Sequence, residues 1–323
     1  MGTIMLEECI VYIKRIEDEV RKCYSEPINL SSDEFVELMV IDGLFMIELF
    51  RKYAHIGNKI ERGDPIFGKS EDLMDSVVDL VLLENQLPMV VLDCLFNVLA
   101  LKKELNGETL NFLALRFLDQ LIPRGEKVIY TNFTGCEVKH ILDLLCKTYF
   151  HNLPEAGNAK KNSCISIPSV TELKRVGVKF VVGSTNGSFL DIKFKDGVME
   201  IPPMVIKYET DTLLQNLIAY EQCSDGKVPY YMTSYRLLMD SLIKSGQDVR
   251  VLRKHGIVTS PLTDEDVAYN FTHRFNELCS EVTLTIFYYS ELCEKVNSYY
   301  GTRRNACGPK LRTLRTILLK FFC

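Results

Sequence analysis

The chain has 323 residues, 47% of them hydrophobic and 25% charged, which is the composition of an ordinary globular protein long enough for one large domain or two smaller ones. Its net charge of −5 argues against a general nucleic-acid-binding protein, because such proteins are basic over a whole face. The charge is uneven: residues 302–323 contain six basic residues and no acid, whereas the rest has 32 basic against 43 acidic residues, a net charge of −11.

Helical patterns dominate the first half of the chain, residues 1–151. Residues 10–24 are amphipathic, and Ser31 with Glu34 forms a capping box that opens a second helix. The apolar residues of this second helix recur at helical spacing: Val36, Val40, Leu44, Ile47 and Phe50. An exposed loop is expected at 55–69, and further helices are predicted over 72–100, 108–121 and 137–151.

The longest hydrophobic region runs from Val77 to Ala100. It is interrupted by acids, amides and a proline: Asp79, Glu84, Asn85, Gln86, Pro88 and Asp93. A membrane-spanning helix needs about 20 largely apolar residues, so we expect no transmembrane segment here. The region is predicted to be one buried helix, or two helices hinged at Pro88.

Three adjacent polar side chains, Glu84, Asn85 and Gln86, lie inside this apolar region. A buried polar group without a hydrogen-bond partner costs about 1–3 kcal/mol. We therefore predict that all three are largely buried and bonded to backbone groups or to side chains of the second half.

Glu84 and Glu221 are the acids set most deeply in apolar sequence. Two interpretations remain open. They could form a general acid pair whose pKa is raised by burial. Alternatively, Glu84 bonds backbone groups near Pro88, and Glu221 caps a helix end.

The second half begins after residues 152–163, which are rich in Asn, Lys, Gly and Pro and are the best linker candidate. Alternating patterns then predict a small three-stranded antiparallel β-meander around residues 178–206. Its turns are expected at Asn186-Gly187 and Asp196-Gly197, and helices should cover one face, that of Leu190, Ile192 and Phe194. Helices resume at 212–222, 231–244, 264–278 (capped by Thr263 with Asp266) and 282–300.

No signature of catalysis or metal binding is found in the sequence. The eleven cysteines form no Cys-x-x-Cys pair, and their scatter fits buried thiols in a reducing compartment. The histidines lack any ligand spacing: His55, His140, His151, His255 and His273. The glycine-rich stretch 183–187 lacks the Gly-Lys-Ser/Thr of a phosphate-binding loop. We therefore expect no catalytic residue, no cofactor and no metal.

The basic C-terminal segment also has an apolar pattern. Leu311, Leu314, Leu318 and Phe321 recur at spacings of three and four, which predicts an amphipathic helix over residues 309–322. This helix would be too short to span a bilayer. It would lie against an anionic membrane surface, or pack on the body of the domain.

Six short motifs occur in order between Ser25 and Tyr300. They read DGLFMIELF at 42–50, LENQLP at 83–88, ELKRVGVKF at 172–180, LDIKF at 190–194, EIPP at 200–203 and NLIAYEQ at 216–222. Together they resemble the motifs of the plant DUF247 family, also named UPF0481. The chain departs from that family by lacking a further N-terminal stretch with a GPYHHG-like segment. It also lacks the Trp-rich element and the transmembrane helix with which members usually end.

The resemblance implies a plant recognition or signalling module, or a protein-interaction module, without catalysis. No activity is established for the family, and some members are pollen determinants of self-incompatibility. A protein partner and association with the plasma membrane are implied, or a cytoplasmic location if the missing membrane helix is genuine. The alternative is a hydrolase of unrecognised type that uses buried acids.

The expected architecture is α+β and predominantly α-helical. A helical half (1–151), a linker (152–163) and a second half of β-meander plus helices (164–301) are expected to pack as one DUF247-like domain. The basic amphipathic tail (302–323) would follow. The oligomeric state cannot be read from the sequence.

Overall fold

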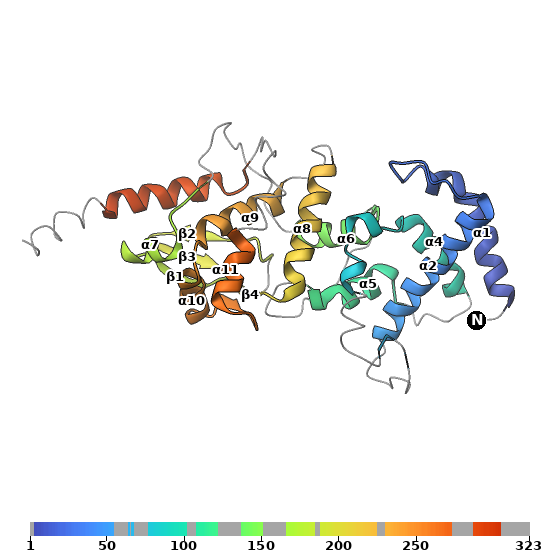
Figure 1. The fold of residues 1–323 in the computed structure, drawn as a ribbon, viewed down its shortest axis with the longest axis horizontal. Helices are drawn as coiled ribbons and strands as arrows, with labels where there is room; N and C mark the ends of the chain where they lie inside the picture. The colour runs from blue at the N-terminus through green and yellow to red at the C-terminus, as the bar shows by residue number, and fades with distance from the viewer. Residues whose placement is uncertain are drawn as a thin grey trace, which may run out of the picture. The chain divides into compact units, whose positions relative to one another are not determined.

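The computed structural model describes residues 3–54, 64, 66–67, 77–101, 108–121, 137–150, 166–184, 188–224, 230–272 and 287–304 (Figure 1). The chain divides into two compact units. The first comprises residues 1–122 and 128–148, and the second comprises 123–127 and 149–323. The predicted fold class is confirmed: the protein is α+β and predominantly helical, with small sheets in the second unit.

The first unit is built from helices. In chain order its described elements are α1 (Thr3–Arg21), α2 (Ser32–Ala54), the 3₁₀ helix η2 (Leu83–Asn85), α4 (Met89–Leu101), α5 (Leu110–Leu118), the 3₁₀ helix η3 (Asp119–Leu121) and α6 (Ile141–Phe150), whose last residues fall in the second unit. Helix α2 lies at the centre and contacts α1, α4 and α5 (Figure 1).

One side of α2 packs against α4 and α5 through apolar side chains. Phe50 of α2 packs on Phe117 of α5, with ring centroids 5.4 Å apart, and both side chains are fully buried. A Cβ at Gly43 would lie 2.4 Å from Cδ1 of Leu95 in α4, so a larger residue here would require the Leu95 side chain to shift. Burial of each large apolar side chain contributes about 1.5–3 kcal/mol, and this side of α2 is therefore held firmly.

The predicted capping box at the start of α2 is confirmed. The Glu34 amide donates to Oγ of Ser31 at 3.4 Å, and the Ser31 amide donates to Oε2 of Glu34 at 2.9 Å. These bonds satisfy backbone donors that a helix N-terminus leaves without intrahelical partners.

The apolar region around Pro88 is interrupted at the proline, as the second of the two predicted alternatives required. A helical turn at 77–79 and η2 precede Pro88, and α4 begins directly after it at Met89. The Met89 amide donates to the carbonyl of Lys139 at 2.7 Å, which ties the start of α4 to the segment before α6.

The second unit combines short strands with helices. Its elements are α7 (Val170–Arg175), β1 (Lys179–Val182), β2 (Lys193–Lys195), β3 (Val198–Ile201), β4 (Met204–Val205), α8 (Tyr208–Cys223), α9 (Tyr231–Leu242), α10 (Gly246–Lys254), β5 (Val258–Thr259) and α11 (Asp264–Thr272), followed by a helical segment at 290–304. Helices α7 and α10 and the pair β4–β5 were not predicted.

The predicted antiparallel meander is wrong in its topology. The strand order is β1-β3-β2, and β2 pairs with β3 antiparallel as expected, but β1 pairs with β3 in parallel. The residues 189–192, predicted to continue the strand, form a turn and an irregular segment before β2. Alternation along a strand sets which face is buried, but it does not determine which neighbour the strand pairs with.

The second predicted turn, Asp196-Gly197, is confirmed. Both residues have positive φ, 51° and 78°, as a type I′ hairpin turn requires, and they join β2 to β3. A Cβ at Gly197 would lie 2.5 Å from the hydroxyl oxygen of Tyr299 in the segment 290–304. The other predicted turn, Asn186-Gly187, lies outside the described residues, as do the linker 152–163 and the tail helix 309–322.

A buried ion pair connects three helices of the second unit. Nη1 of Arg236 in α9 lies 3.5 Å from Oδ1 of Asp211 in α8, and the two side chains are 4% exposed. The Arg236 guanidinium also donates to the carbonyl of Asn270 in α11 and lies 4.8 Å from the ring centroid of Phe271. Arg236 therefore joins α8, α9 and α11.

Candidate functional site

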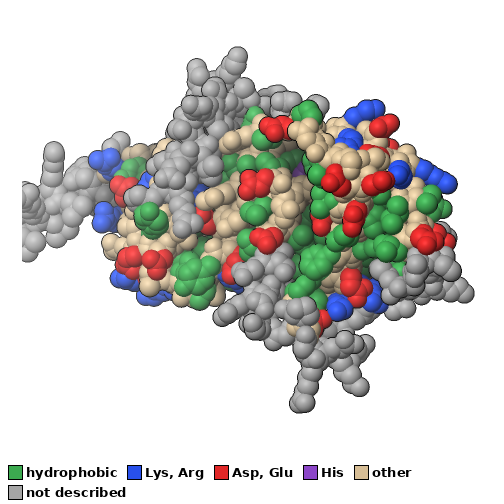
Figure 2. Space-filling model, turned by 45° about the vertical axis from the view of Figure 1, so that its right-hand side comes forward, with side chains coloured by type: hydrophobic (Ala, Val, Ile, Leu, Met, Phe, Trp, Pro, Cys, Tyr) green, Lys and Arg blue, Asp and Glu red, His purple; other side chains and the backbone are tan. Residues whose placement is uncertain are grey.

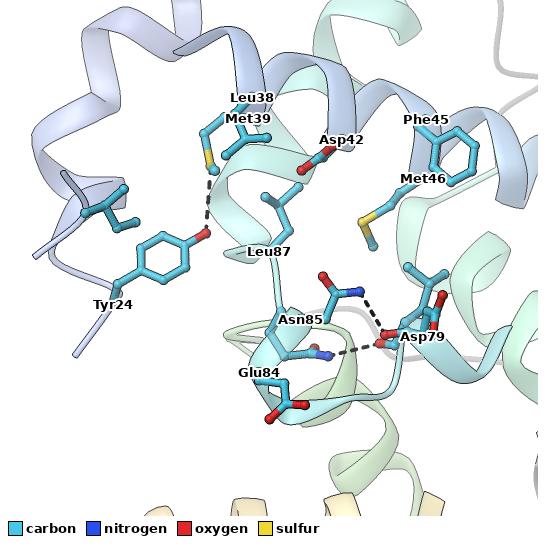
Figure 3. A pocket seen from close by; sticks show the side chains of 13 residues that line it. Tyr24, Leu38, Met39, Asp42, Phe45, Met46, Asp79, Glu84, Asn85 and Leu87 are labelled. Carbon is cyan, nitrogen blue, oxygen red and sulfur yellow. Dashed lines mark hydrogen bonds between the residues drawn. The ribbon is translucent and has the colours of Figure 1, made fainter. Parts of the chain in front are cut away.

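A groove of about 440 Å³ lies on the first unit (Figure 3). Its walls come from α2, from the segment that follows α1, and from the stretch 79–87. Two sequence motifs meet here, because Asp42, Phe45 and Met46 belong to the first, and residues 84–87 belong to the second. Both motifs were recognisable in the sequence, but their position on one groove was not predicted.

The α2 wall continues into an exposed apolar stripe. Leu38, Ile41 and Phe45 are 42%, 56% and 49% exposed and recur at i, i+3 and i+7, so they share one face of the helix. This face is opposite the one that packs on α4 and α5. Exposed apolar surface of this kind, continuous with a groove, is typical of an interaction site.

The second helical stripe of α2 could have been found in the sequence. The predicted apolar face of α2 comprises the residues that pack inward: Val36, Val40, Ile47 and Phe50 are buried, and Leu44 is half-buried. Leu38, Ile41 and Phe45 have the same spacing on the other face. A helix with apolar residues on two opposite faces has more apolar surface than one core contact covers.

The polar residues 84–86 form the opposite wall, and the prediction that all three are buried is wrong. Glu84 and Asn85 are exposed and Gln86 is half-buried. The predicted bonds to backbone are confirmed for two of them. Asn85 donates to the carbonyl of Asp79 at 3.0 Å (Figure 3). Gln86 donates to the carbonyls of Leu80 and Leu82 at 3.0 and 2.7 Å.

Gln86 also reaches a distant part of the chain. Its Oε1 accepts a hydrogen bond from the Leu142 amide at 3.0 Å, in the first turn of α6. The partner is again a backbone group, the first of the two kinds of partner that were predicted. Gln86 thus caps α6 and holds the groove wall in place.

Replacing Gln86 with Leu is expected to lower the free energy of unfolding by about 1–3 kcal/mol, because it leaves the Leu142 amide and two carbonyls without this partner. Asn85→Leu is the matched control, and we expect it to cost under about 1 kcal/mol, since this exposed amide can be replaced by water. Guanidinium denaturation of both variants measures the difference. An equal loss in the two variants would contradict the role of Gln86.

The charged residues in the described lining of the groove are acids: Asp42 on α2, and Asp79 and Glu84 on the other wall. Burial raises the pKa of the Asp42 carboxyl above its usual range. Burial likewise raises the pKa of Tyr24 to about 12, and its hydroxyl lies 3.8 Å from the sulfur of Met39 (Figure 3). The groove therefore combines apolar walls with negative charge. Figure 2 shows acidic side chains lying among hydrophobic ones on one face of the first unit.

Of the two acids named as a possible pair, Glu84 lies exposed in the first unit and Glu221 lies buried in the second. Glu221 is fully buried at the end of α8, where its carboxylate accepts hydrogen bonds from the amides of Met232 and Thr233 and from the Thr233 hydroxyl, at 2.6–2.9 Å. It therefore caps the N-terminus of α9, as the structural interpretation held. Burial raises the pKa of Glu221 to about 7, although these hydrogen bonds act to lower it.

Two of the five histidines lie in the described part of the chain. His140 precedes α6, where Nδ1 accepts from the Asp143 amide at 3.2 Å, and burial lowers the pKa of its imidazole to about 4. The Nδ1 atom of His255 lies 2.8 Å from the carbonyl of Val251. Among the described residues, no three His, Cys, Asp or Glu side chains are grouped so as to hold a metal ion.

None of the described helices combines the length and apolarity that crossing a membrane requires.

Comparison with known proteins agrees with the family resemblance of the six motifs. The model of DUF247, a family described as plant protein of unknown function, matches residues 3–322. The UPF0481 protein At3g47200 of Arabidopsis thaliana is 28% identical over 264 residues, covering 75% of this chain and 54% of that protein. The UPF0481 protein At3g02645 of the same plant is 24% identical over 395 residues, covering 94% and 73%. No solved structure matches the chain.

These matches place the chain in a class of plant proteins whose function is not established. The chain belongs to the DUF247 family, as the motifs predicted. It spans about half the length of the first of the two curated relatives.

Proposed function

We propose that this protein is a non-catalytic interaction module for recognition or signalling, and that a partner protein docks in the groove of the first unit. The observation that carries the proposal is the exposed stripe of Leu38, Ile41 and Phe45 beside that groove. Aliphatic and aromatic side chains exposed together, next to a concave surface, are the usual anchors of protein interfaces.

A hydrolytic groove is less well supported. The described residues that line it include no Ser, Cys or His, so they supply no Ser/His or Cys/His nucleophile. Asp42 and Glu84 come from different walls (Figure 3), and Glu84 is exposed to solvent, whereas the hydrolase alternative required buried acids.

Quantitative capture from plant tissue tests the proposal. The full chain and the variant Leu38→Ala/Phe45→Ala serve as baits after chemical cross-linking, and the captured proteins are compared by mass spectrometry. The matched control is Val182→Ala/Tyr208→Ala, which removes apolar side chains that are 44% and 73% exposed in the second unit. We expect specific proteins to be lost from the groove variant and retained by the control. Identical captured sets from all three baits would refute the docking role.

Membrane proximity is a second part of the proposed function, and residues 302–323 would supply it. Their six basic residues and lack of acids suit an anionic surface, to which each charge contributes about 1 kcal/mol. Co-sedimentation with anionic vesicles, for the intact chain and for one ending at Tyr300, tests this. We expect only the intact chain to bind, and to bind less as salt rises. Failure of both chains to bind would remove the membrane role.

A further inference from the structure

We infer that the partner docks through an amphipathic helix with apolar residues along one face and Lys or Arg beside them. This inference rests on the proposed function and specifies the chemistry of its partner. Four features of the first unit carry it: the length of the stripe, the absence of a strand edge, the charge of the groove and the firmness of its walls.

The stripe has the dimensions of a helix contact. From Leu38 to Phe45 it runs along seven residues of α2, which at 1.5 Å per residue is about 10 Å, or two helical turns. A partner helix with apolar residues at i, i+3 or i+4, and i+7 presents anchors over the same length. Ridges of side chains on the two helices can then interlock.

The groove offers no strand edge to an extended peptide. In the described residues of the first unit every regular element is a helix or a 3₁₀ helix, and the strands β1 to β5 belong to the second unit. An extended segment docked here would leave its backbone groups without partners in an apolar groove, whereas a helix satisfies its own.

The charge of the groove selects a basic partner. In the part of the lining that the structure describes, the charged residues are Asp42, Asp79 and Glu84. Glu34 and Glu37 lie exposed on α2, the helix that carries Asp42. Three basic residues of α1 and α2 are engaged with acids: Lys14 with Asp33, Arg21 with Glu17, and Arg51 with Glu48. An acidic helix would therefore be repelled, and a basic one attracted.

The walls are held in position before a partner arrives. Gly43 allows α2 to approach α4, and Gln86 anchors the opposite wall to α6. Met39 and Met46 of α2 line the groove, and their flexible side chains can adjust to different apolar anchors. A firm groove with an adaptable lining lowers the ordering cost of binding.

Fluorescence anisotropy with three synthetic peptides tests the inference on the full chain. The first has two heptads with Leu on one face and Lys elsewhere. The second has Glu in place of Lys, and the third is a scrambled form of the first, so that its leucines no longer share a face. We expect the first to bind at least about tenfold more tightly than either of the others. Circular dichroism should show that it becomes helical on binding.

Variants locate the binding site. Leu38→Ala/Phe45→Ala should weaken the Lys peptide by about tenfold or more, and Asp42→Asn/Glu84→Gln should weaken it and reduce its salt dependence. The control Glu265→Gln/Glu294→Gln removes two exposed acids of the second unit and should change neither.

Three results would overturn the inference. If the Glu peptide binds as tightly as the Lys peptide, and both depend on Leu38 and Phe45, the partner is not basic. If the scrambled peptide binds as tightly as the Lys peptide, binding does not require the leucines to share one face of a helix. In both cases the docking role of the groove stands, because it is tested separately by capture from tissue. If Lys-peptide binding ignores Leu38 and Phe45 altogether, its contact is a general attraction to an acidic protein and the inference fails.

Discussion

Arg236→Met is expected to lower the free energy of unfolding by about 3–5 kcal/mol, the usual cost of removing one partner from a buried ion pair. The variant keeps much of the side-chain volume but leaves the Asp211 carboxylate buried, with Gln215 as a hydrogen-bond partner at 2.6 Å. It also removes the donor to the Asn270 carbonyl and the cation over the Phe271 ring. The contacts among α8, α9 and α11 should weaken together.

The double variant Arg236→Met/Asp211→Leu separates charge from packing. Replacing a buried ion pair by apolar residues is often nearly neutral, so we expect the double variant to recover at least half of the stability that Arg236→Met loses. Guanidinium denaturation and hydrogen exchange of α9 measure both. A double variant less stable than the single one would show that the Arg236 contacts to α11 outweigh the ion pair.

The second large effect is a loss of stability with rising pH that depends on Glu221. Burial raises the pKa of this carboxyl to about 7 in the folded protein, from an ordinary value of 4.5. The folded state therefore binds this proton more tightly than the unfolded state. The corresponding stability is fully present below pH 4.5 and is lost as pH rises through about 7. At 1.36 kcal/mol per pKa unit, the loss is about 3 kcal/mol.

Glu221→Gln is the control for this pH dependence, because an amide resembles the protonated acid and does not titrate. The free energy of unfolding of both proteins should be measured at intervals from about pH 4.5 to pH 8, the range that brackets the linkage. As pH rises, the free energy of unfolding of the unsubstituted protein should fall relative to that of Glu221→Gln. A constant difference would mean that the hydrogen bonds from Met232 and Thr233 hold the carboxyl ionised throughout.

Local features of this fold were predictable from the sequence because their causes are local. The Ser31–Glu34 capping box, the break at Pro88 and the Asp196-Gly197 turn each depend on a few adjacent residues. The cap at Thr263 is of the same kind: its hydroxyl accepts from the Asp266 amide at 3.1 Å, at the start of α11.

The features that were missed depend on residues far apart in the sequence. The groove exists because Phe45 and Gln86 are brought to facing walls, and nothing near either residue in the sequence indicates the other. Glu84 and Asn85 stand in an apolar sequence yet face solvent, because η2 turns them outward from the helices that bury Leu87 and Met89. Which way a short polar turn faces is decided by packing, and periodicity carries no information on it.

The parallel pairing of β1 with β3 gives the small sheet an order of assembly. Strands β2 and β3 are joined by a two-residue turn, so they can meet within microseconds. Strand β1 can add only when the intervening chain has closed a loop between Val182 and Val198, and its partner strand must already be in place. The Asp196-Gly197 turn should therefore belong to the folding nucleus, and β1 should dock late. Changes at Gly197 would slow folding, whereas changes at Val181 would chiefly hasten unfolding.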